Sequence, residues 1–282
     1  MSKLTIASYY GGKINMIDTL VPILETIPHK AYIEAFGGMG SILLNKKPVH
    51  KEVLNDLDSL IHNLYTIIRN HPRSLIDAIN LTPYSRQEYK LIIDNLDLAI
   101  TIGDPIDLAR CAYALIHLSR SRSLTHGGFR SVGVKYQSNA ARHFHTNHHL
   151  LHVAARLSSV VLENTDYQKL FQAWNGNDSL FYFDPPYPNN TRTSRGYRHE
   201  WNSTKQADML SFLIQNSASK IVFSTYWSPE YTALEASGWL KIQKPTKVSN
   251  RIGGHIIQTE IIFLSPAAAP YYNPTTLFPT TL

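Results

Sequence analysis

The sequence contains only one cysteine, Cys111, so it cannot form an intramolecular disulfide. That cysteine lies within an apolar helical pattern over residues 105–118, where a small core residue is a better interpretation than a nucleophile. The sequence also lacks any run of about 18 apolar residues, and its N-terminus lacks the hydrophobic segment of a signal peptide. We therefore expect a cytoplasmic protein that makes no membrane contact.

Acidic residues are the minority among the charged ones. The chain has 21 Asp and Glu against 27 Lys and Arg, which gives a formal net charge of +6. A basic surface suits a polyanionic partner, although charge alone indicates this only weakly. With 282 residues, of which 43% are apolar, the chain can bury a sizeable core. This length permits one large domain or, as we favour, a catalytic domain that carries an insert.

The clearest feature of the sequence is a buried-strand pattern that ends at a rigid tetrapeptide. Residues 180–183 are apolar and aromatic, and they are followed directly by Asp184, Pro185, Pro186 and Tyr187. Each proline fixes φ and removes an N–H donor, so the strand cannot continue and the tetrapeptide is held in one geometry. Open α/β sheets bind ligands at the carboxyl ends of their strands. The alternative is a structural role, in which the aspartate only caps a proline turn.

A strand pattern over residues 31–36 is followed by a glycine loop. The loop contains Gly37, Gly38 and Gly40 and precedes a short helical pattern over residues 42–45. Glycines let the backbone approach a ligand closely, as in nucleotide-binding turns between a strand and a helix. A glycine loop by itself is nevertheless a weak signal.

The next strand pattern, residues 53–56, ends at Asp56, about 20 residues beyond the glycine loop. Nucleotide-binding α/β folds have an acid at this spacing, where it binds ribose hydroxyls. Asp58 could take that role instead, and Asp56 could merely cap the helical pattern over residues 59–69.

A glycine-lysine motif opens the first helical pattern, residues 14–27. Tyr9 lies before Gly11, Gly12 and Lys13. Backbone N–H groups at a helix start, an ammonium group and an aromatic ring together suit an anion beside a flat base. A glycine turn with a solvated lysine is the alternative.

Residues 70–150 show helical patterns followed by a basic stretch, which we interpret as an inserted helical domain. This stretch and a later polar loop contain the candidate DNA-binding residues Arg120, Arg122, Phe129, Arg130, Lys135, Arg192 and Arg195. Cations bind phosphates, arginine reads guanine edges, and an aromatic ring can wedge between bases. A solvated loop is the alternative. Five histidines in residues 143–152 have no Cys or carboxylate to complete a ligand set, so we predict no metal site.

In their order along the chain, the motifs resemble those of the Dam-type (D12 class) DNA adenine-N6 methyltransferase family, over a stretch from Tyr9 to Leu264. The resemblance implies that Asp184, Pro185, Pro186 and Tyr187 are catalytic. It also implies S-adenosyl-L-methionine as the methyl donor, with cofactor-binding positions at Tyr9, Lys13, Glu34, Phe36, Gly37, Gly38, Gly40, Asp56, Asp166 and Asp184. For Asp166, which follows the strand pattern over residues 160–164, a helix N-cap is the alternative.

The resemblance predicts an α/β fold, a Rossmann-like doubly wound methyltransferase sheet with an inserted small helical DNA-recognition domain. Residues 1–69 and 151–264 would form the S-adenosylmethionine-dependent catalytic domain, and residues 70–150 the insert. After Leu264, a Pro/Thr-rich stretch without periodicity predicts a disordered tail over residues 265–282.

The expected function is site-specific methylation of N6 of a flipped-out adenine in double-stranded DNA. The expected protein is a monomer, and a cognate restriction endonuclease is its candidate protein partner. One alternative keeps the fold and changes the acceptor to cytosine N4, an RNA adenine or a protein glutamine amide. Another is a non-catalytic nucleic-acid-binding module, which should have lost the glycines, Lys13, Asp56 or Asp184; all are present.

Overall fold

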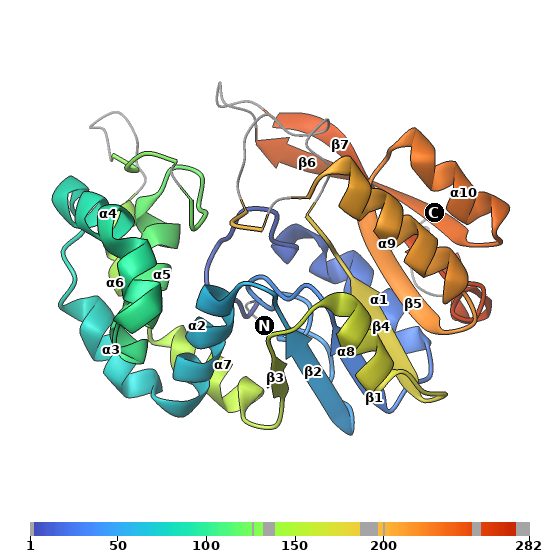
Figure 1. The fold of residues 1–282 in the computed structure, drawn as a ribbon, viewed down its shortest axis with the longest axis horizontal. Coiled ribbons are helices and arrows are strands. Elements are labelled where there is room, and N and C mark those ends of the chain that lie inside the picture. The colour runs from blue at the N-terminus through green and yellow to red at the C-terminus, as the bar shows by residue number, and fades with distance from the viewer. Residues whose placement is uncertain are drawn as a thin grey trace, which may run out of the picture.

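The computed structural model describes residues 3–125, 127–131, 139–186, 197–199, 201–249 and 255–274. Within these ranges seven strands form one sheet in the order β3-β2-β1-β4-β5-β7-β6 (Figure 1). The strands are β1 (Ala31–Glu34), β2 (Lys51–Asn55), β3 (Val161–Glu163), β4 (Ser179–Phe183), β5 (Lys220–Tyr226), β6 (Leu240–Ser249) and β7 (His255–Leu264). β7 pairs antiparallel with β5 and β6, and the other neighbouring strands are parallel. The predicted doubly wound α/β sheet is therefore confirmed.

The central strands β1 and β4 bring the two strongest sequence motifs together. Their register pairs Glu34 with Tyr182, and the amide of Ala35 donates to the carbonyl of Tyr182 at 3.0 Å. Both strands run in the same direction, so the glycine loop after β1 and the Asp-Pro-Pro stretch after β4 leave the sheet side by side. Adjacent loops at this edge are the usual ligand-binding place of such a sheet.

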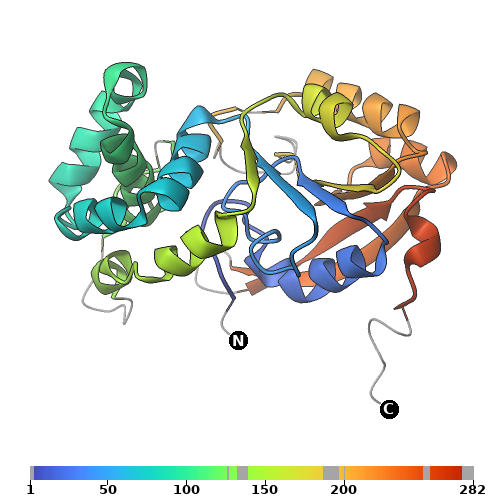
Figure 2. The same ribbon diagram turned by 90° about the horizontal axis from the view of Figure 1, so that it is seen from below.

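Helices cover both faces of the sheet (Figure 2). Alternation along a strand sends Tyr32 into the cluster that α1 (Ile17–Thr26) completes, and sends Ile33 into the opposite cluster. That second cluster is completed by α8 (Tyr167–Trp174), α9 (Ser203–Gln215) and α10 (Thr232–Ala236). Short 3-10 turns precede α1 and α10, at Ile14–Met16 and Pro229–Tyr231.

A group of helices lies beside the β3 edge of the sheet (Figure 1). It consists of α2 (Ser59–Asn70), α3 (Pro72–Asn80), α4 (Arg86–Ile102), α5 (Pro105–Leu118), α6 (Ala140–His145) and α7 (His149–Leu157). α5 packs against α2, α3 and α4, and the buried residues of these helices belong to the same hydrophobic cluster as the α1 face of the sheet. Because the core is continuous, the division of the chain at residues 70 and 150 stays a prediction. No described helix is long and apolar enough to span a membrane.

Two segments differ from the sequence-based expectations. Residues 42–45 form hydrogen-bonded turns instead of a helix, and Pro48 follows closely, where its ring and missing N–H prevent a longer helix. Ordered structure also continues beyond Leu264, where the sequence predicts a disordered tail. The Ser265 hydroxyl donates to the Ser219 carbonyl at 2.7 Å, and a 3-10 turn spans Ala269–Tyr271.

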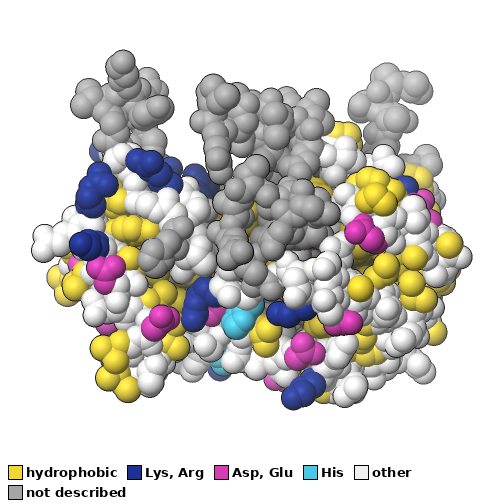
Figure 3. All heavy atoms as spheres, turned by 45° about the horizontal axis from the view of Figure 1, so that its top comes forward, with side chains coloured by type: hydrophobic (Ala, Val, Ile, Leu, Met, Phe, Trp, Pro, Cys, Tyr) yellow, Lys and Arg dark blue, Asp and Glu magenta, His cyan; other side chains and the backbone are white. Residues whose placement is uncertain are grey.

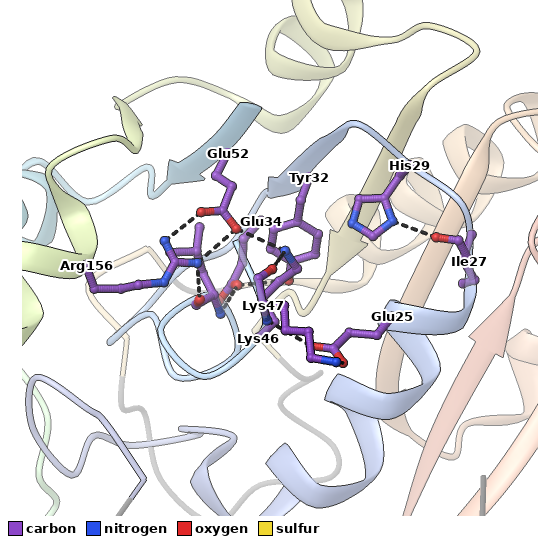
Figure 4. Close-up of polar contacts among 10 residues, drawn as sticks. Glu25, Ile27, His29, Tyr32, Glu34, Lys46, Lys47, Glu52 and Arg156 are labelled. Atoms are coloured by element: carbon purple, nitrogen blue, oxygen red, sulfur yellow. Dashed lines mark hydrogen bonds and ion pairs between the residues drawn. The ribbon is translucent and has the colours of Figure 1, made fainter. Parts of the chain in front are cut away.

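A buried ion cluster ties β2 to α7 and to the turns after the glycine loop (Figure 4). Glu52 Oε2 accepts from Arg156 Nη1 at 2.6 Å, and Oε1 accepts from Arg156 Nη2 at 2.9 Å and from Lys46 Nζ at 3.0 Å. The Glu52 side chain is 2% exposed. Arg156 also donates to the Leu43 carbonyl at 2.8 Å. The cluster therefore fixes the turns that follow the glycine loop.

Arg156→Met should lower the free energy of unfolding by about 2 kcal/mol. A buried charge that loses its only partner costs about 3–5 kcal/mol. The expected loss is smaller here because Lys46 still pairs with Glu52. Urea denaturation measures this change. Lys30→Met, in the exposed pair with Asp178, is the matched control and should cost less than about 1 kcal/mol. Equal losses in the two variants would contradict a structural role for the buried cluster.

Candidate active site

A buried group of three charges lies at the carboxyl end of β4. Lys13 Nζ lies 2.9 Å from Asp184 Oδ1 and 3.0 Å from Glu260 Oε1, and the exposed side-chain fractions are 8%, 13% and 4% for Lys13, Asp184 and Glu260. Lys13 comes from the turn before α1, Asp184 from the end of β4 and Glu260 from β7. The group thus joins three distant parts of the chain.

Burial and the sharing of one ammonium by two carboxylates determine the pKa shifts in this group. Burial alone would lower the pKa of Lys13, but Asp184 and Glu260 outweigh burial and raise it, so the lysine stays charged. Burial raises the pKa of Asp184, although its ion pair with Lys13 acts in the opposite direction. A second donor supports Asp184: the Ser224 hydroxyl donates to Oδ1 at 2.9 Å, and the Tyr182 hydroxyl lies 2.9 Å from the same serine oxygen.

Lys13 and Asp184 line a cavity together with Gly37 and Gly38 of the glycine loop, which requires its glycines. A Cβ on Gly37 would lie 2.6 Å from Leu54 Cδ1 and 2.7 Å from the Tyr65 hydroxyl. Gly38 and Gly40 have φ of 53° and 64°, a region that residues with a side chain rarely adopt. The backbone therefore passes close to the cavity with no side chain in the way.

Three further carboxylates line the cavity. Asp56 accepts from the Gly38 amide at 2.9 Å and from the Asp58 amide at 2.9 Å, and burial raises its pKa to about 7. Asp58 is the N-cap of α2, so Asp56 does not cap that helix. Glu34 accepts from the Tyr32 hydroxyl at 3.0 Å and the Leu43 amide at 2.9 Å, and burial raises its pKa to about 8.

Residues 197–199 form one wall of the cavity. The ring of Tyr197 packs edge-on against Tyr10 at 5.3 Å and against Tyr9 at 6.4 Å between centroids. Arg198 Nη1 lies 2.8 Å from Asp58 Oδ1. Because a Cβ on Gly11 would collide with the Tyr197 hydroxyl, this glycine permits the close approach of that wall.

A second cavity adjoins the first, and both are lined by Phe36, Leu57 and Trp201. Phe36 packs against Trp201 at 5.7 Å and against Tyr167 at 5.8 Å between centroids. Asp166 lines the second cavity and also caps α8, where it accepts from the Gln168 amide at 2.8 Å. Asp166 can therefore cap α8 and still line a cavity.

An isolated antiparallel bridge between Ser119 and Phe129 closes the first part of the basic stretch after α5 into a loop. Arg120 Nε donates to the Phe129 carbonyl at 3.1 Å. The Phe129 ring packs against Tyr84 at 5.6 Å and against Tyr89 at 6.3 Å between centroids, so it anchors the basic stretch to the helical group. A wedge role would require the ring to leave this packing.

Arg122 connects the basic stretch to the N-terminal motif. Its carbonyl accepts from the Tyr10 amide at 2.9 Å, and its guanidinium donates to the Ser8 hydroxyl. Its φ of 53° is the only positive value among the described non-glycine residues. The geometry therefore couples residues 8–10 to the basic stretch.

A basic groove lies between residues 5–8 and helices α5, α6 and α7. Cationic or titratable side chains line it, namely His117, Arg122, Arg130, Arg142, His143 and His149. None of the described residues that line it is acidic. Burial, followed by the neighbouring positive charges, lowers the pKa of His117 to about 3. Figure 3 shows Lys and Arg side chains gathered over the helical part of the molecule.

No described group of three His, Cys, Asp or Glu residues could hold a metal ion.

The structure brings most of the predicted catalytic and cofactor-binding residues together around the two cavities, but not Gly40 or the predicted DNA-binding residues. Pro186 lines the first cavity and Pro185 is buried. Four predicted residues lie outside the described ranges, namely Tyr187, Lys135, Arg192 and Arg195. Sequence reasoning missed Ser224, Trp201 and Glu260 as site residues. The only signal for Glu260 was an acid at the start of the apolar run of residues 261–264.

Glu34→Gln should make the protein without ligand more stable than wild type as pH rises. The amide oxygen keeps an acceptor for Tyr32 and Leu43, while the charge is removed. Because burial raises the pKa of Glu34 from 4.5 to about 8, its contribution to stability is complete below pH 4.5 and is lost as pH rises through about 8. Melting temperatures between about pH 5 and pH 9 test this. A difference that does not grow with pH would contradict the assignment.

A family comparison agrees with this geometry. Residues 9–243 match the model of the D12 class N6 adenine-specific DNA methyltransferases, a range that contains the glycine motifs, the Asp-Pro-Pro-Tyr stretch and the whole helical group. The match covers more than half of the chain and confirms the family that the motifs resemble. The chain belongs to the D12 class N6 adenine-specific DNA methyltransferase family.

Proposed function

We propose that the protein transfers a methyl group from S-adenosyl-L-methionine to N6 of a specific adenine in double-stranded DNA, after that adenine has left the base stack. The observation that carries the proposal is the position of Asp184. Its carboxylate lies at the end of β4, beside the glycine loop after β1, and is held by Lys13 and Ser224. Within this proposal the enzyme is monomeric and cytoplasmic, and a restriction endonuclease of the same specificity is its candidate partner.

The residues of the two cavities fit the chemical groups of the cofactor. Asp56 has lone pairs left to accept from ribose hydroxyls, because each of its oxygens accepts only one backbone N–H among the described contacts. Phe36 and Trp201 offer aromatic faces for adenine, and Asp166 offers an acceptor for its amino group. Glu34 and Asp184 suit the cationic part of the cofactor, which supplies a methyl group already activated on a sulfonium.

Asp184 would act on the target amino group through charge and hydrogen bonding. The lone pair of adenine N6 is delocalised into the ring, so this nitrogen is a poor nucleophile. Acceptors directed at its N–H bonds, from Asp184 and the Pro185 carbonyl, would keep electron density on nitrogen and stabilise the positive charge that develops there. Tyr187 would stack on the base. Neither a cysteine nucleophile nor a metal is needed for direct transfer; Cys111 is buried in α5 and burial raises its pKa to about 11.

DNA is the partner that the basic groove suits. Phosphates would find positive charge on Arg122, Arg130 and Arg142, with no acid among the described lining residues. The base itself cannot be reached inside a duplex, so it must be extruded at a cost of a few kcal/mol. The hydrogen bond between the Tyr10 amide and the Arg122 carbonyl would keep a duplex bound in the groove close to the first cavity.

Incubation with duplex DNA and S-adenosylmethionine should produce N6-methyladenine, which mass spectrometry of the digested nucleosides detects. Asp184→Asn is nearly isosteric but replaces a carboxylate oxygen with a donor and removes the charge, so turnover should fall by about 10²–10³-fold. The DNA affinity of this variant, measured separately, should change much less. Production of N4-methylcytosine alone, or labelling of RNA or protein alone, would contradict the proposed substrate.

Arg130→Gln should weaken DNA binding and flatten its salt dependence. Loss of one phosphate contact reduces the slope of the logarithm of affinity against the logarithm of salt by about 0.9. Fluorescence anisotropy at several salt concentrations measures the slope. Arg73→Gln, on the exposed surface of α3 and outside the groove, removes the same charge and should leave the slope unchanged. An unchanged slope in Arg130→Gln would remove the groove from the DNA interface.

A further inference from the structure

The histidines of residues 143–152 have no part in the function proposed above, yet two of them lie in the basic groove. His143 on α6 and His149 on α7 line it, together with His117 on α5. The three arginines of the groove pair with no carboxylate in the described part of the chain. Positive side chains that are held together without a carboxylate favour the binding of an anion.

One hydrogen bond determines which nitrogen of His149 carries the hydrogen. The ring Nε2 lies 3.1 Å from the Ile6 carbonyl oxygen. A carbonyl oxygen can only accept, so Nε2 carries the hydrogen and donates it. In the neutral ring Nδ1 then has a lone pair and no hydrogen. The neutral ring therefore has no free N–H for a phosphate oxygen, because its single N–H already binds Ile6.

A proton on Nδ1 would turn His149 into a phosphate ligand. Both nitrogens of an imidazolium donate, so Nε2 would keep the Ile6 carbonyl while Nδ1 offered a charged donor to a phosphate oxygen. Histidine is the side chain that ordinarily changes its charge between about pH 5 and pH 8. Because α7 begins at His149, the positive end of the helix dipole also favours an anion there.

We propose that His149 is a phosphate-binding residue of the DNA interface, whose Nδ1 takes up a proton from solvent as the DNA backbone enters the basic groove. The inference rests on the proposed function, since it needs DNA in that groove. DNA phosphates stay charged near neutral pH, so the change of charge falls on the protein. DNA should therefore bind more tightly as pH falls from about 8 to about 6.

The other charged and titratable groups that face His149 come from the elements that line the groove. They are His117 on α5, Arg122 and Arg130 of the basic stretch, and Arg142 and His143 on α6. Residues 5–8 have no titratable side chain, and no charged residue of α2 or α3, the helices packed against α7, lines the groove. Arginines stay charged. Burial and the neighbouring charges lower the pKa of His117 to about 3, so this ring stays neutral between pH 6 and pH 8.

Two further considerations decide the design of the test. His143 is a second imidazole in the groove, so variants must be compared with one another. Burial raises the pKa values of Asp56 and Glu34 to about 7 and about 8, but these residues line the first cavity. A substitution of His149 leaves their titration in place, so the difference between two histidine variants belongs to the groove.

Fluorescence anisotropy of labelled duplex DNA, at constant ionic strength and without cofactor, measures the affinity between about pH 6 and pH 8. A phosphate that raises the pKa of an ordinary imidazole by about one unit strengthens binding about sixfold over this range. Wild type should show a rise of at least this size. His149→Gln keeps an N–H for the Ile6 carbonyl but cannot take up a proton, so it should lose most of the rise.

His152→Gln is the matched control, since His152 is exposed on the same helix and lies outside the groove lining. This variant should keep the pH dependence of wild type. An affinity that does not change with pH, or a pH dependence that His149→Gln retains in full, would overturn the proposal and leave His149 a residue that only holds Ile6.

Nitrogen-15 NMR of histidine-labelled wild type reads the ring itself and carries the test if His149→Gln fails to fold. At about pH 7, addition of duplex DNA should convert His149 Nδ1 from a nitrogen without hydrogen to an N–H nitrogen. An Nδ1 that remains without hydrogen in the complex at about pH 6 would also overturn the proposal. Both measurements follow binding alone, so their failure is distinct from a failure to form N6-methyladenine.

Discussion

The ion cluster of Lys13, Asp184 and Glu260 is the interaction on which the site depends. It joins the turn before α1, the end of β4 and the antiparallel strand β7, which are far apart in sequence. Burying three charges is expensive, and apolar residues of similar volume would often be at least as stabilising. Two of its members, Lys13 and Asp184, line the first cavity, which favours a chemical role for the cluster over a purely stabilising one. The Lys46–Glu52–Arg156 cluster is different: it lies under the loop and fixes backbone, without a place in the cavity lining.

The fold makes this cluster possible because β1 and β4 are parallel neighbours. Their loops leave the sheet together, so Gly38 and Asp184 line one cavity although 146 residues separate them in sequence. The rest of the cavity is lined by segments outside the strands, such as residues 9–13 and 197–199. Tyr197 and Arg198 lie on it through contacts with Tyr10 and Asp58. The basic stretch reaches the same region through Arg122, whose carbonyl accepts from the Tyr10 amide, so it shares a hydrogen bond with the N-terminal motif.

The sequence predicted the features that depend on local pattern. Residues 180–183 are apolar on both faces and stop at two prolines, which indicates a central strand and its end, and the glycines after residue 36 indicate a close backbone approach. Glu260 could not be predicted in this way. Its role depends on the register of β7 against β5, and nothing local distinguishes it from an exposed acid beside an apolar run. The apolar pattern at residues 42–45 predicts a helix where the structure has turns, because so short a pattern does not distinguish the two.

The proposed function depends most on one contact, in which Asp184 receives the amino group of an extruded adenine. A structure of the protein with duplex DNA and a non-reactive analogue of S-adenosylmethionine tests this most directly. We predict an extrahelical adenine whose N6 lies within hydrogen-bond distance, about 2.7–3.2 Å, of Asp184 and the Pro185 carbonyl, with Lys13 still bound to Glu260. A duplex with every adenine stacked, or a cytosine amino group at Asp184, would contradict the account.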